Sequence, residues 1–366
     1  MKVSGRWRRA IELADDGRSV IVLDQARLPY EIAWLPVGEL AHAVRAIRHM
    51  HIRGAPLIGA TAAYGVALAM RADPSDAGLA AACAALCDTR PTAINLRWAV
   101  GTMRAALDGM APEAREAAAF AAAGKLCDDD AAQCEAIGRH GVAVIRAAAE
   151  RAGDRPVSVL THCNAGWLAT VDWGTALAPI YKAYEDGIPV HVWVDETRPR
   201  NQGLLTAWEL AQHGVPHTVI ADNQGGHLMQ RGEVDLCIVG TDRTTRNGDV
   251  CNKIGTYLKA LAAHDNGVAF YAAVPSPSID WTIGEPHEIP IEERDGDEVR
   301  RVTGRDAHGA PATVEIVPAA TAVANAAFDV TPRRLVTGLI TERGVTPATR
   351  DGLRALFPEH AGAPTP

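Results

Sequence analysis

The sequence contains no CxxC pair, and its seven cysteines are odd in number. They are Cys83, Cys87, Cys127, Cys134, Cys163, Cys237 and Cys251. A disulfide framework is therefore unsupported, and free thiols in a reducing compartment are the simplest interpretation. The first residues, MKVSGRWRRA, also lack the apolar stretch of a secretory leader. We expect a cytoplasmic protein.

An excess of positive charge is also missing. The 366 residues include 36 Lys and Arg against 44 Asp and Glu, which gives a net charge of -8. Such a chain has no general attraction for nucleic acid or for an anionic membrane surface. We expect neither as a partner, so any anionic ligand must be held by a local group of basic side chains.

A long run without charge occurs only in the first half, at GAPLIGATAAYGVALAM (54–70). Its length approaches the minimum for a membrane span of about 17 to 20 residues. More than half of it is Ala and Gly, which offer little apolar surface. We expect a closely packed helix inside the protein.

Metal-binding motifs are equally scarce, since HExxH is absent. The HxxxH pair His213 and His217 spans HGVPH, whose Gly and Pro prevent the helix that would align both rings. We expect no metal.

The chain of 366 residues is long enough for two domains. Residues 1–153 show helical spacing of apolar residues after a short strand-like start, and Asp128-Asp129-Asp130 predicts a turn within the Ala-rich stretch 113–152. The segment 284–318 is charged and loop-rich and is interpreted as a surface excursion without chemistry. The final AGAPTP is predicted to be disordered.

Residues 154–366 have a different pattern, in which short β-branched runs alternate with amphipathic helical segments. The runs are VSVLTHC, VHVWVDE, HTVIADN, LCIVGTD and AFYAAVPS. This alternation predicts right-handed crossovers and a parallel sheet. The fold class is therefore α/β: a C-terminal doubly wound, Rossmann-like catalytic domain with a mainly helical N-terminal domain, and no GxGxxG after its first strand.

In doubly wound sheets the ligand lies at the carboxyl ends of the strands. Polar residues follow all five predicted strands, and they are Cys163 with Asn164, Asp195 with Glu196, Asp222 with Asn223, Asp242 with Arg243, and Ser276. We interpret Asp195 and Asp222 as turn or structural residues.

Cys163 lies in THCNAGWLAT, where the first predicted strand ends at a Gly-containing turn. Backbone N–H groups at such a turn can lower the pKa of a thiol, yet most free cysteines are small buried residues. Position alone leaves the two interpretations even. His162 points to the opposite face of an extended strand, so we assign it a packing role.

Asp242 ends the run LCIVGTD. A carboxyl group at the mouth of an apolar sheet can have a raised pKa and act as a general acid, although most aspartates after strands cap turns.

Three basic segments suggest an anionic group such as a phosphate. Arg53-Gly54-Ala55-Pro56 precedes a helix that Pro56 would start, Asn252-Lys253 is expected to open another helix, and Arg90 lies in a turn at a helix boundary. Each alone is more often a capped helix start with a solvated charge.

Five motifs in order resemble the methylthioribose-1-phosphate isomerase family. They are IRGAPLIG (52–59), TRPTAINLRWA (89–99), THCNAG (161–166), DETRPRNQG (195–203) and GTDRTTRNGDVCNKIGTY (240–257). The resemblance extends from about Arg45 to Glu293. Cys251 and the bulky Trp167 depart from the family pattern and put the fine shape of the pocket in question.

The resemblance implies a cofactor-free aldose-ketose isomerase of methionine salvage that binds a sugar phosphate and forms a homodimer. It also implies roles for matching positions: Asp242 as proton donor, Cys163 as second catalytic group, and substrate contacts from Arg53, Gly54, Ala55, Arg90, Gln202, Asn252 and Lys253. Hydrogen would move from C2 to C1 either as a proton, with Cys163 as base or relay, or as a hydride.

Other functions remain open at this point. A related sugar 1-phosphate, such as 5-deoxyribose 1-phosphate or ribose 1,5-bisphosphate, would suit the same fold, and a second phosphate would need its own cationic site. A non-enzymatic subunit of the translation initiation factor 2B type has no need of Cys163 and Asp242 facing one ligand. A cysteine hydrolase lacks a well-placed histidine.

Overall fold

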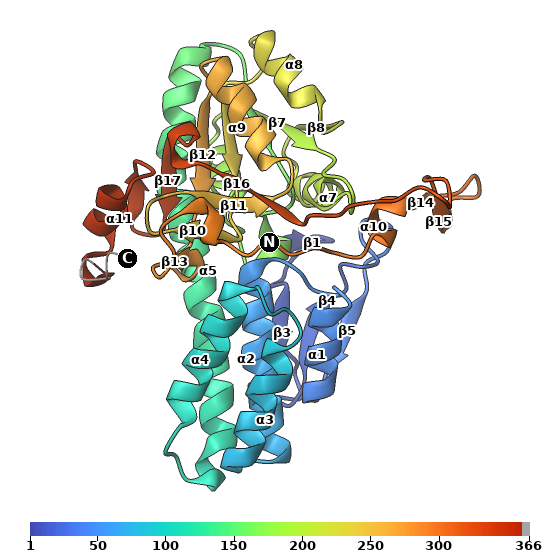
Figure 1. Cartoon of the computed structure of the whole chain (residues 1–366), viewed down its shortest axis with the longest axis vertical. Helices are drawn as coiled ribbons and strands as arrows, with labels where there is room; N and C mark the ends of the chain where they lie inside the picture. Colours follow the sequence, from blue (N-terminus) through green and yellow to red (C-terminus); the bar gives the residue numbers. More distant parts are fainter. Residues whose placement is uncertain (361–366) are drawn as a thin grey trace.

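The computed structural model describes residues 1–360, so the AGAPTP segment predicted to be disordered lies outside the described residues. Figure 1 shows a helical part that carries most of the N-terminal residues, and a mixed part built around a sheet that carries the C-terminal half. The predicted fold class, α/β with a helical N-terminal part, is confirmed.

The N-terminal part begins with short strands that the apolar pattern predicts only as a strand-like start. They are β1 (Lys2–Val3), β2 (Arg6–Trp7), β3 (Ile11–Leu13), β4 (Val20–Leu23) and β5 (Trp34–Val37), of which the last three form an antiparallel sheet. The helices that follow are α1 (Leu40–Arg48), α2 (Ala55–Ala72), α3 (Asp76–Cys87), α4 (Ile94–Leu107) and α5 (Pro112–Ala152).

Helix α2 is the uncharged run of the sequence and lies among the other helices (Figure 1). Within residues 1–360 it is the one helix long and apolar enough to cross a membrane, but 78% of it is buried inside the protein. Gly54 caps it at φ +90°, and a Cβ there would overlap the backbone of Ala169. Glycine thus lets the start of α2 approach the turn that follows Cys163.

Helix α5 is continuous, so the turn predicted at Asp128-Asp129-Asp130 is wrong. Each of the three aspartates has a hydrogen-bond or ion-pair partner within the helical conformation. Asp128 pairs with Arg9 at 2.6 Å, Asp129 pairs with Lys125 at 2.6 Å, and half-buried Asp130 accepts a hydrogen bond from the backbone N–H of Val171 at 2.8 Å. Two of these partners lie far away in the sequence, where no local pattern reveals them.

The C-terminal half forms a seven-stranded sheet that is parallel except for its last strand. Its strands are β6 (Val157–Thr161), β7 (Val190–Asp195), β8 (His217–Ile220), β9 (Leu236–Val239), β12 (Ala269–Ala273), β17 (Gly338–Thr341) and β18 (Gly344–Thr346). If the strands are numbered in chain order from β6, the first six follow the 3-2-1-4-5-6 order of a doubly wound sheet. The seventh, β18, pairs with β17 at the edge. All five strands predicted from β-branched runs are present.

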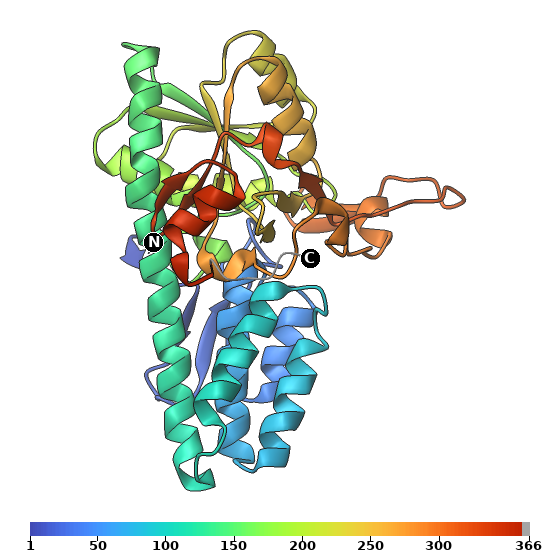
Figure 2. The same ribbon diagram turned by 60° about the vertical axis from the view of Figure 1, so that its left-hand side comes forward.

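The order reverses between β6 and β9, which are neighbours in the sheet. Helices cover both faces: α5 and α6 (Ala178–Glu185) lie on one side, and α8 (Gln224–Gln230) and α9 (Thr256–Asp265) on the other (Figure 2). Helix α7 (Gly203–His213) connects β7 to β8. Ligands of such sheets bind at the reversal, beyond the carboxyl ends of the strands.

A second, four-stranded sheet pairs segments far apart in the sequence. Its strands are β13 (Ile279–Asp280), β10 (Arg243–Thr245), β11 (Val250–Lys253) and β16 (Phe328–Thr331). Asn252 and Lys253 therefore end a strand, and the prediction that they open a helix is wrong, because α9 starts at Thr256 after Gly255.

Helix α10 (Asp297–Arg300) and the hairpin β14 (Arg301–Arg305) and β15 (Pro311–Glu315) extend sideways as an arm (Figure 1). The division of the chain at residues 153/154 stays a prediction. It falls between α5 and β6, while α5 contacts helices of the N-terminal part as well as α6 and β17.

Candidate active site

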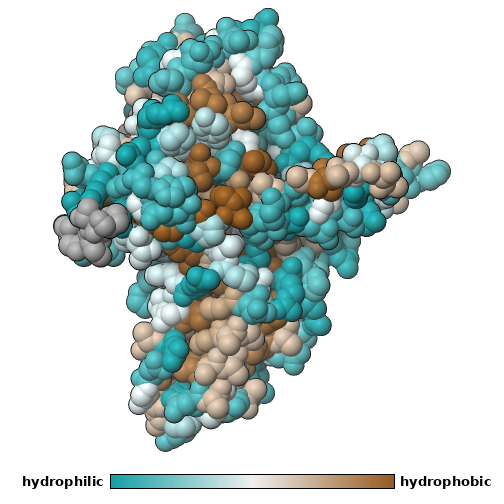
Figure 3. All heavy atoms as spheres, in the orientation of Figure 1, coloured by the Kyte–Doolittle hydropathy of each residue, from teal (hydrophilic) through white to brown (hydrophobic). Residues whose placement is uncertain are grey.

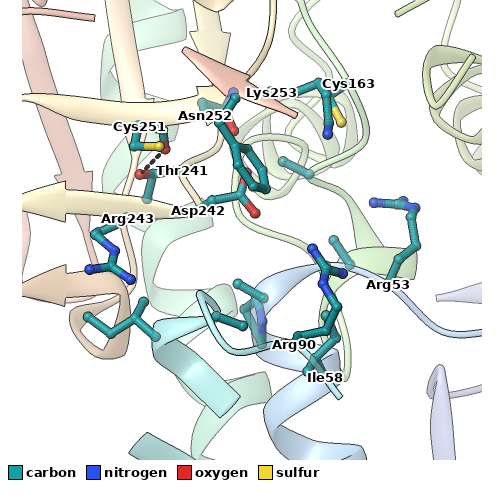
Figure 4. A pocket seen from close by; sticks show the side chains of 18 of the residues that line it. Arg53, Ile58, Arg90, Cys163, Thr241, Asp242, Arg243, Cys251, Asn252 and Lys253 are labelled. Carbon is teal, nitrogen blue, oxygen red and sulfur yellow. Dashed lines mark hydrogen bonds between the residues drawn. The ribbon is translucent and has the colours of Figure 1, made fainter. Parts of the chain in front are cut away.

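Cys163 and Asp242 follow β6 and β9, the two strands at which the sheet order reverses. Both line one pocket, as do all the other predicted site residues. These are Arg53, Gly54, Ala55, Arg90, Gln202, Asn252 and Lys253. Figure 4 shows Cys163, Asp242, Arg90 and Arg53 around a common space. The start of α2, the α3–α4 turn and both sheets thus meet at one place.

The backbone at Cys163 is held in a left-handed conformation, with φ +67°. Its N–H donates to Oγ1 of Thr197 at 2.9 Å, and its carbonyl accepts from Oγ1 of Thr206 at 2.8 Å. Such a conformation costs a non-glycine residue about 1 to 3 kcal/mol. Two threonines from the β7–α7 region therefore fix the direction of the thiol.

Burial raises the pKa of the Cys163 thiol, although Arg53 and Lys253 act in the opposite direction. The backbone N–H of Asn164 lowers this pKa, as expected for the turn, but burial outweighs its effect.

Burial also raises the pKa of Asp242, against the attraction of Lys253, Arg90 and Arg53. Its backbone N–H donates to the carbonyl of Cys251 at 2.9 Å, which fixes the residue to the start of the second sheet. A carboxyl group with a raised pKa is suited to deliver a proton.

Lys253 and Arg53 supply the positive field of the pocket. Burial lowers the pKa of Lys253, while Cys163 and Asp242 oppose this, and Nζ donates to the carbonyl of Ala327 at 2.9 Å. The pKa of Arg53 is likewise lowered by burial. Its guanidinium donates to the backbone carbonyl of Asn164 at 3.0 Å and to the side-chain Oδ1 of the same residue.

Several buried polar atoms of the pocket have no hydrogen-bond partner within residues 1–360. They include Nε of Arg53, Nε of Arg90 and Oε1 of Gln202. Buried polar groups are normally paired, so unpaired ones at a pocket mark where a polar ligand would bind. The pattern fits a ligand with phosphate and hydroxyl oxygens.

The other basic side chains of the pocket are already paired. Arg90 pairs with Glu292 at 2.7 Å, and Arg243 pairs with Asp280 at 2.8 Å. Arg243 extends away from the common space in Figure 4. Arg90 therefore keeps only part of its donor capacity for a ligand.

Segment 284–318 is more than the predicted surface excursion. Ile289, Pro290 and Arg294 line the pocket, and Glu292 holds Arg90. Its charged composition gave no sign of this, because Glu292 and Arg294 contact Arg90 and Met50, which lie far away in the sequence.

His162 and the acidic residues of the β7 and β8 ends form a separate cluster with Lys259. His162 is 1% exposed, and its Nδ1 lies 3.0 Å from Oδ2 of Asp195. Lys259 Nζ lies 3.1 Å from the same carboxylate oxygen and donates to the carbonyl of Asp222. Asp195 and Asp222 thus have the structural roles predicted for them.

This cluster has the donor set of a metal site, since ligand atoms of His162, Asp195 and Asp222 lie within 4.8 Å of one another. Lys259 already supplies a positive charge there. His162 has more than the predicted packing role, because its Nε2 also donates to the carbonyl of Ile254 at 2.8 Å.

The two departures from the family pattern lie in different places. Cys251 lines the pocket, whereas Trp167 is fully buried and stacks on Trp208 with ring centroids 6.4 Å apart. Sequence reasoning placed Asn164 at a strand end without giving it a role. It missed Glu209 altogether, because the side chains that Glu209 contacts lie on other elements.

Comparisons with known proteins agree with this geometry. The model of the initiation factor 2 subunit family matches residues 51–348. Methylthioribose-1-phosphate isomerase of Rhodospirillum rubrum is 61% identical and covers 100% of this chain and 96% of its own length. The protein of that name from Paramagnetospirillum magneticum is 62% identical over 99% of this chain and 100% of its own length.

Two solved structures are similar throughout. The crystal structure of 5-methylthioribose 1-phosphate isomerase from Pyrococcus horikoshii OT3 has a TM-score of 0.82 and 36% identity, covering 97% of each chain. The delta subunit of translation initiation factor eIF-2B from A. fulgidus has a TM-score of 0.79 and 36% identity, covering 96% of this chain and 100% of its own.

Proposed function

The chain belongs to the methylthioribose-1-phosphate isomerases of the initiation factor 2 subunit family, and we propose that its pocket performs the reaction of that name. This is the conversion of 5-methylthioribose 1-phosphate to 5-methylthioribulose 1-phosphate in methionine salvage. The observation that carries the proposal is a carboxyl group and a thiol, both half-buried, that face one pocket beside Arg53 and Lys253.

The substrate is a cyclic acetal locked by its anomeric phosphate, so the ring must open before hydrogen can move. Asp242 would give its proton to the ring oxygen as the bond from that oxygen to C1 breaks. The raised pKa of Asp242 supports this role, because the acid must hold its proton until the ring opens.

Hydrogen then moves from C2 to C1. The raised pKa of Cys163 supports the hydride route, since a base that removes the C2 proton would have to be a thiolate. In that route the C2 hydrogen passes with its electron pair to C1, the C2 hydroxyl loses its proton to the Asp242 carboxylate, and C2 becomes the ketone. Cys163 would position and polarise the substrate without exchanging hydrogen.

The phosphate would be held by Arg53 and Lys253, with Arg90, Gln202, Asn252 and the backbone of Gly54 and Ala55 completing the site. These residues line one pocket, and Gly54 caps the N-terminus of α2, where free N–H groups favour an anion. The start of α2 therefore supports a phosphate subsite.

Purified protein would be incubated with 5-methylthioribose 1-phosphate, 5-deoxyribose 1-phosphate and ribose 1,5-bisphosphate, and ketose formation followed. We expect the methylthio sugar to have the highest kcat/KM. When this sugar carries deuterium at C2, we expect the product to retain the deuterium at C1. Turnover of none of the sugars would refute the isomerase, and a preference for the bisphosphate would favour that alternative.

Cys163→Ser tests the thiol, with Cys251→Ser as the matched control from the same pocket. We expect a large loss of kcat for Cys163→Ser alone. Equal activities of both variants would refute the role of Cys163.

We also propose that the protein is a cytoplasmic homodimer. Val314 in β15 and Ile316 just after β15 are 54% and 52% exposed, and apolar side chains gather on the arm in Figure 3. Such exposure on a projecting hairpin supports contact with a second copy. Light scattering of the purified protein should give the mass of two chains. The mass of a single chain would refute the dimer.

A further inference from the structure

Glu209 is a buried carboxylate that no step of the proposed reaction uses. It lies in the middle of α7, is 0% exposed and does not line the pocket. A buried charge of this kind is costly unless hydrogen bonds or an opposite charge compensate it.

Four donors surround the two oxygens of Glu209. Oε1 accepts from Nδ2 of Asn164 at 2.7 Å and from the N–H of Leu168 at 2.9 Å. Oε2 accepts from the N–H of Trp167 at 2.7 Å and from the hydroxyl of Tyr181 at 3.0 Å. Burial raises the pKa of Glu209, while the hydrogen bonds from Asn164, Leu168 and Tyr181 and the charge of Arg53 oppose that rise.

The oxygen Oε1 of Glu209 determines the orientation of the Asn164 amide. Because Oε1 accepts hydrogen bonds, it requires the Nδ2 end of Asn164, which leaves Oδ1 to face Arg53. The Arg53 guanidinium donates to this Oδ1 and to the Asn164 carbonyl. The chain of contacts thus runs from Glu209 through Asn164 to the buried cation of the pocket.

The same amide is tied to the thiol segment. Nδ2 of Asn164 also donates to Oγ1 of Thr206 at 3.1 Å, and Thr206 donates to the carbonyl of Cys163 at 2.8 Å. A flip of the Asn164 amide would therefore disturb both Arg53 and the loop that carries Cys163.

We propose that Glu209 is a positioning residue, which acts through the Asn164 amide to hold the Arg53 guanidinium in the orientation that binds the substrate phosphate. The inference rests on the proposed function, since it takes the phosphate to be the ligand of Arg53. The competing explanation is that Glu209 only anchors the turn at Trp167 and Leu168.

Glu209→Gln separates the two explanations. Glutamine has one acceptor oxygen, and an NH2 group replaces the other oxygen of Glu209. Some of the four groups that donate to Glu209 would therefore face the NH2 group, which cannot accept. If the NH2 faces Asn164, that amide must flip and turn its own NH2 toward Arg53. We expect the KM for 5-methylthioribose 1-phosphate to rise roughly 10- to 100-fold, the scale of a misplaced binding group. Competitive inhibition by inorganic phosphate should weaken in parallel.

Tyr181→Phe is the matched control, because it removes one donor to Glu209 from the side opposite to Asn164. It should lower the melting temperature and leave KM and phosphate inhibition near the wild-type values. A Glu209→Gln protein with lower stability but wild-type KM and phosphate inhibition would overturn the proposal in favour of the anchor.

Asn164→Leu provides a second variant if Glu209→Gln does not fold. It keeps Glu209 and breaks the link, so it should show the same rise in KM, and the double variant should show no further rise. An unchanged KM would overturn the proposal. Inactivity of the wild type would instead count against the proposed function, and phosphate affinities measured by calorimetry would still compare the variants.

Discussion

Two polar clusters lie near the carboxyl edge of the same sheet, and they differ in how their charges are compensated. In the cluster of His162, Asp195 and Lys259, the charged groups are in direct contact. In the pocket, Asp242, Arg53 and Lys253 influence one another through space, and burial dominates the pKa shift of each.

The difference shows which polar residues at a strand end are available for chemistry. Both clusters contain buried groups, and both follow strands of the doubly wound sheet. Charged groups in direct contact mainly stabilise the fold, whereas groups held apart around a pocket retain the capacity to bind and to exchange protons. A polar residue at the carboxyl edge of the sheet can therefore belong to a catalytic site or to a structural cluster, and its position alone does not distinguish the two.

Asp242→Asn should have the largest effect, because it removes the proton that opens the sugar ring and keeps the shape of the side chain. We expect kcat to fall by about 10² to 10⁴, the usual contribution of a general acid. The measurement is steady-state ketose formation from 5-methylthioribose 1-phosphate. Asp195→Asn is the comparison in the paired cluster, and it should mainly lower stability. A loss of kcat that is equal in both variants would remove the distinction between the clusters.

Lys259→Met should have the largest effect on stability. Lys259 is 3% exposed, and without it the Asp195 carboxylate loses the lysine charge 3.1 Å from its Oδ2 and keeps the contact with His162. Removing one partner of a buried pair costs about 3 to 5 kcal/mol. Urea unfolding of the wild type and of Lys259→Met would measure this loss of free energy.

Lys125→Met is the matched control for a lysine in an exposed pair, since its side chain is 74% exposed beside Asp129. It should cost about 0 to 1 kcal/mol. Equal unfolding free energies of the two lysine variants would show that the His162 cluster does not stabilise the fold.

Much of the fold follows from local patterns. Alternation of β-branched runs and helices predicted β6, β7, β8, β9 and β12, whose spacing and strand order are those of a doubly wound sheet. The second sheet was missed because its strands are short and pair residues as distant as Cys251 and Val330. Only tertiary contacts reveal such pairings.

The site divides in the same way. The local pattern placed Cys163 and Asp242 at strand ends but left their roles open, and those roles, like the ligand contacts expected of the cations, came from the resemblance of the motifs around them. Glu209 could not, since within LLTAWELAQHG it has the position of any polar residue on an amphipathic helix. Its role comes from contacts with Asn164 and Tyr181 on other elements.

Within residues 1–360 Lys253 has no carboxylate partner in an ion pair, so Lys253→Met compares such a cation with an ion-paired one of the same pocket. Loss of a hydrogen bond from a charged group costs about 1.5 to 3 kcal/mol, so the KM for the sugar phosphate should rise roughly 10- to 100-fold. Arg243→Met removes a cation that already pairs with Asp280. It should change KM less and stability more, and the reverse order in initial-rate and urea measurements would contradict the comparison.

The smallest expected effect is the pH dependence of stability in Asp242→Asn. Burial raises the pKa of Asp242 in the folded protein above its usual value of 3.8. The stability that this carboxyl contributes is therefore fully present below the unfolded pKa and is lost as pH rises through the folded pKa. We expect Asp242→Asn to become more stable relative to the wild type across that window, as measured by urea unfolding at a series of pH values.

Asp235 is the control with the opposite sign. Burial acts to raise its pKa, but hydrogen bonds from Arg155 and from the N–H of Ser158 hold the pKa below 3.8. Its contribution is present above the unfolded pKa and is lost as pH falls through the folded pKa, so Asp235→Asn should become less stable relative to the wild type as pH rises. Parallel pH profiles of Asp242→Asn and Asp235→Asn would mean that Asp242 is compensated like a structural carboxylate, and it could not be the acid of the reaction.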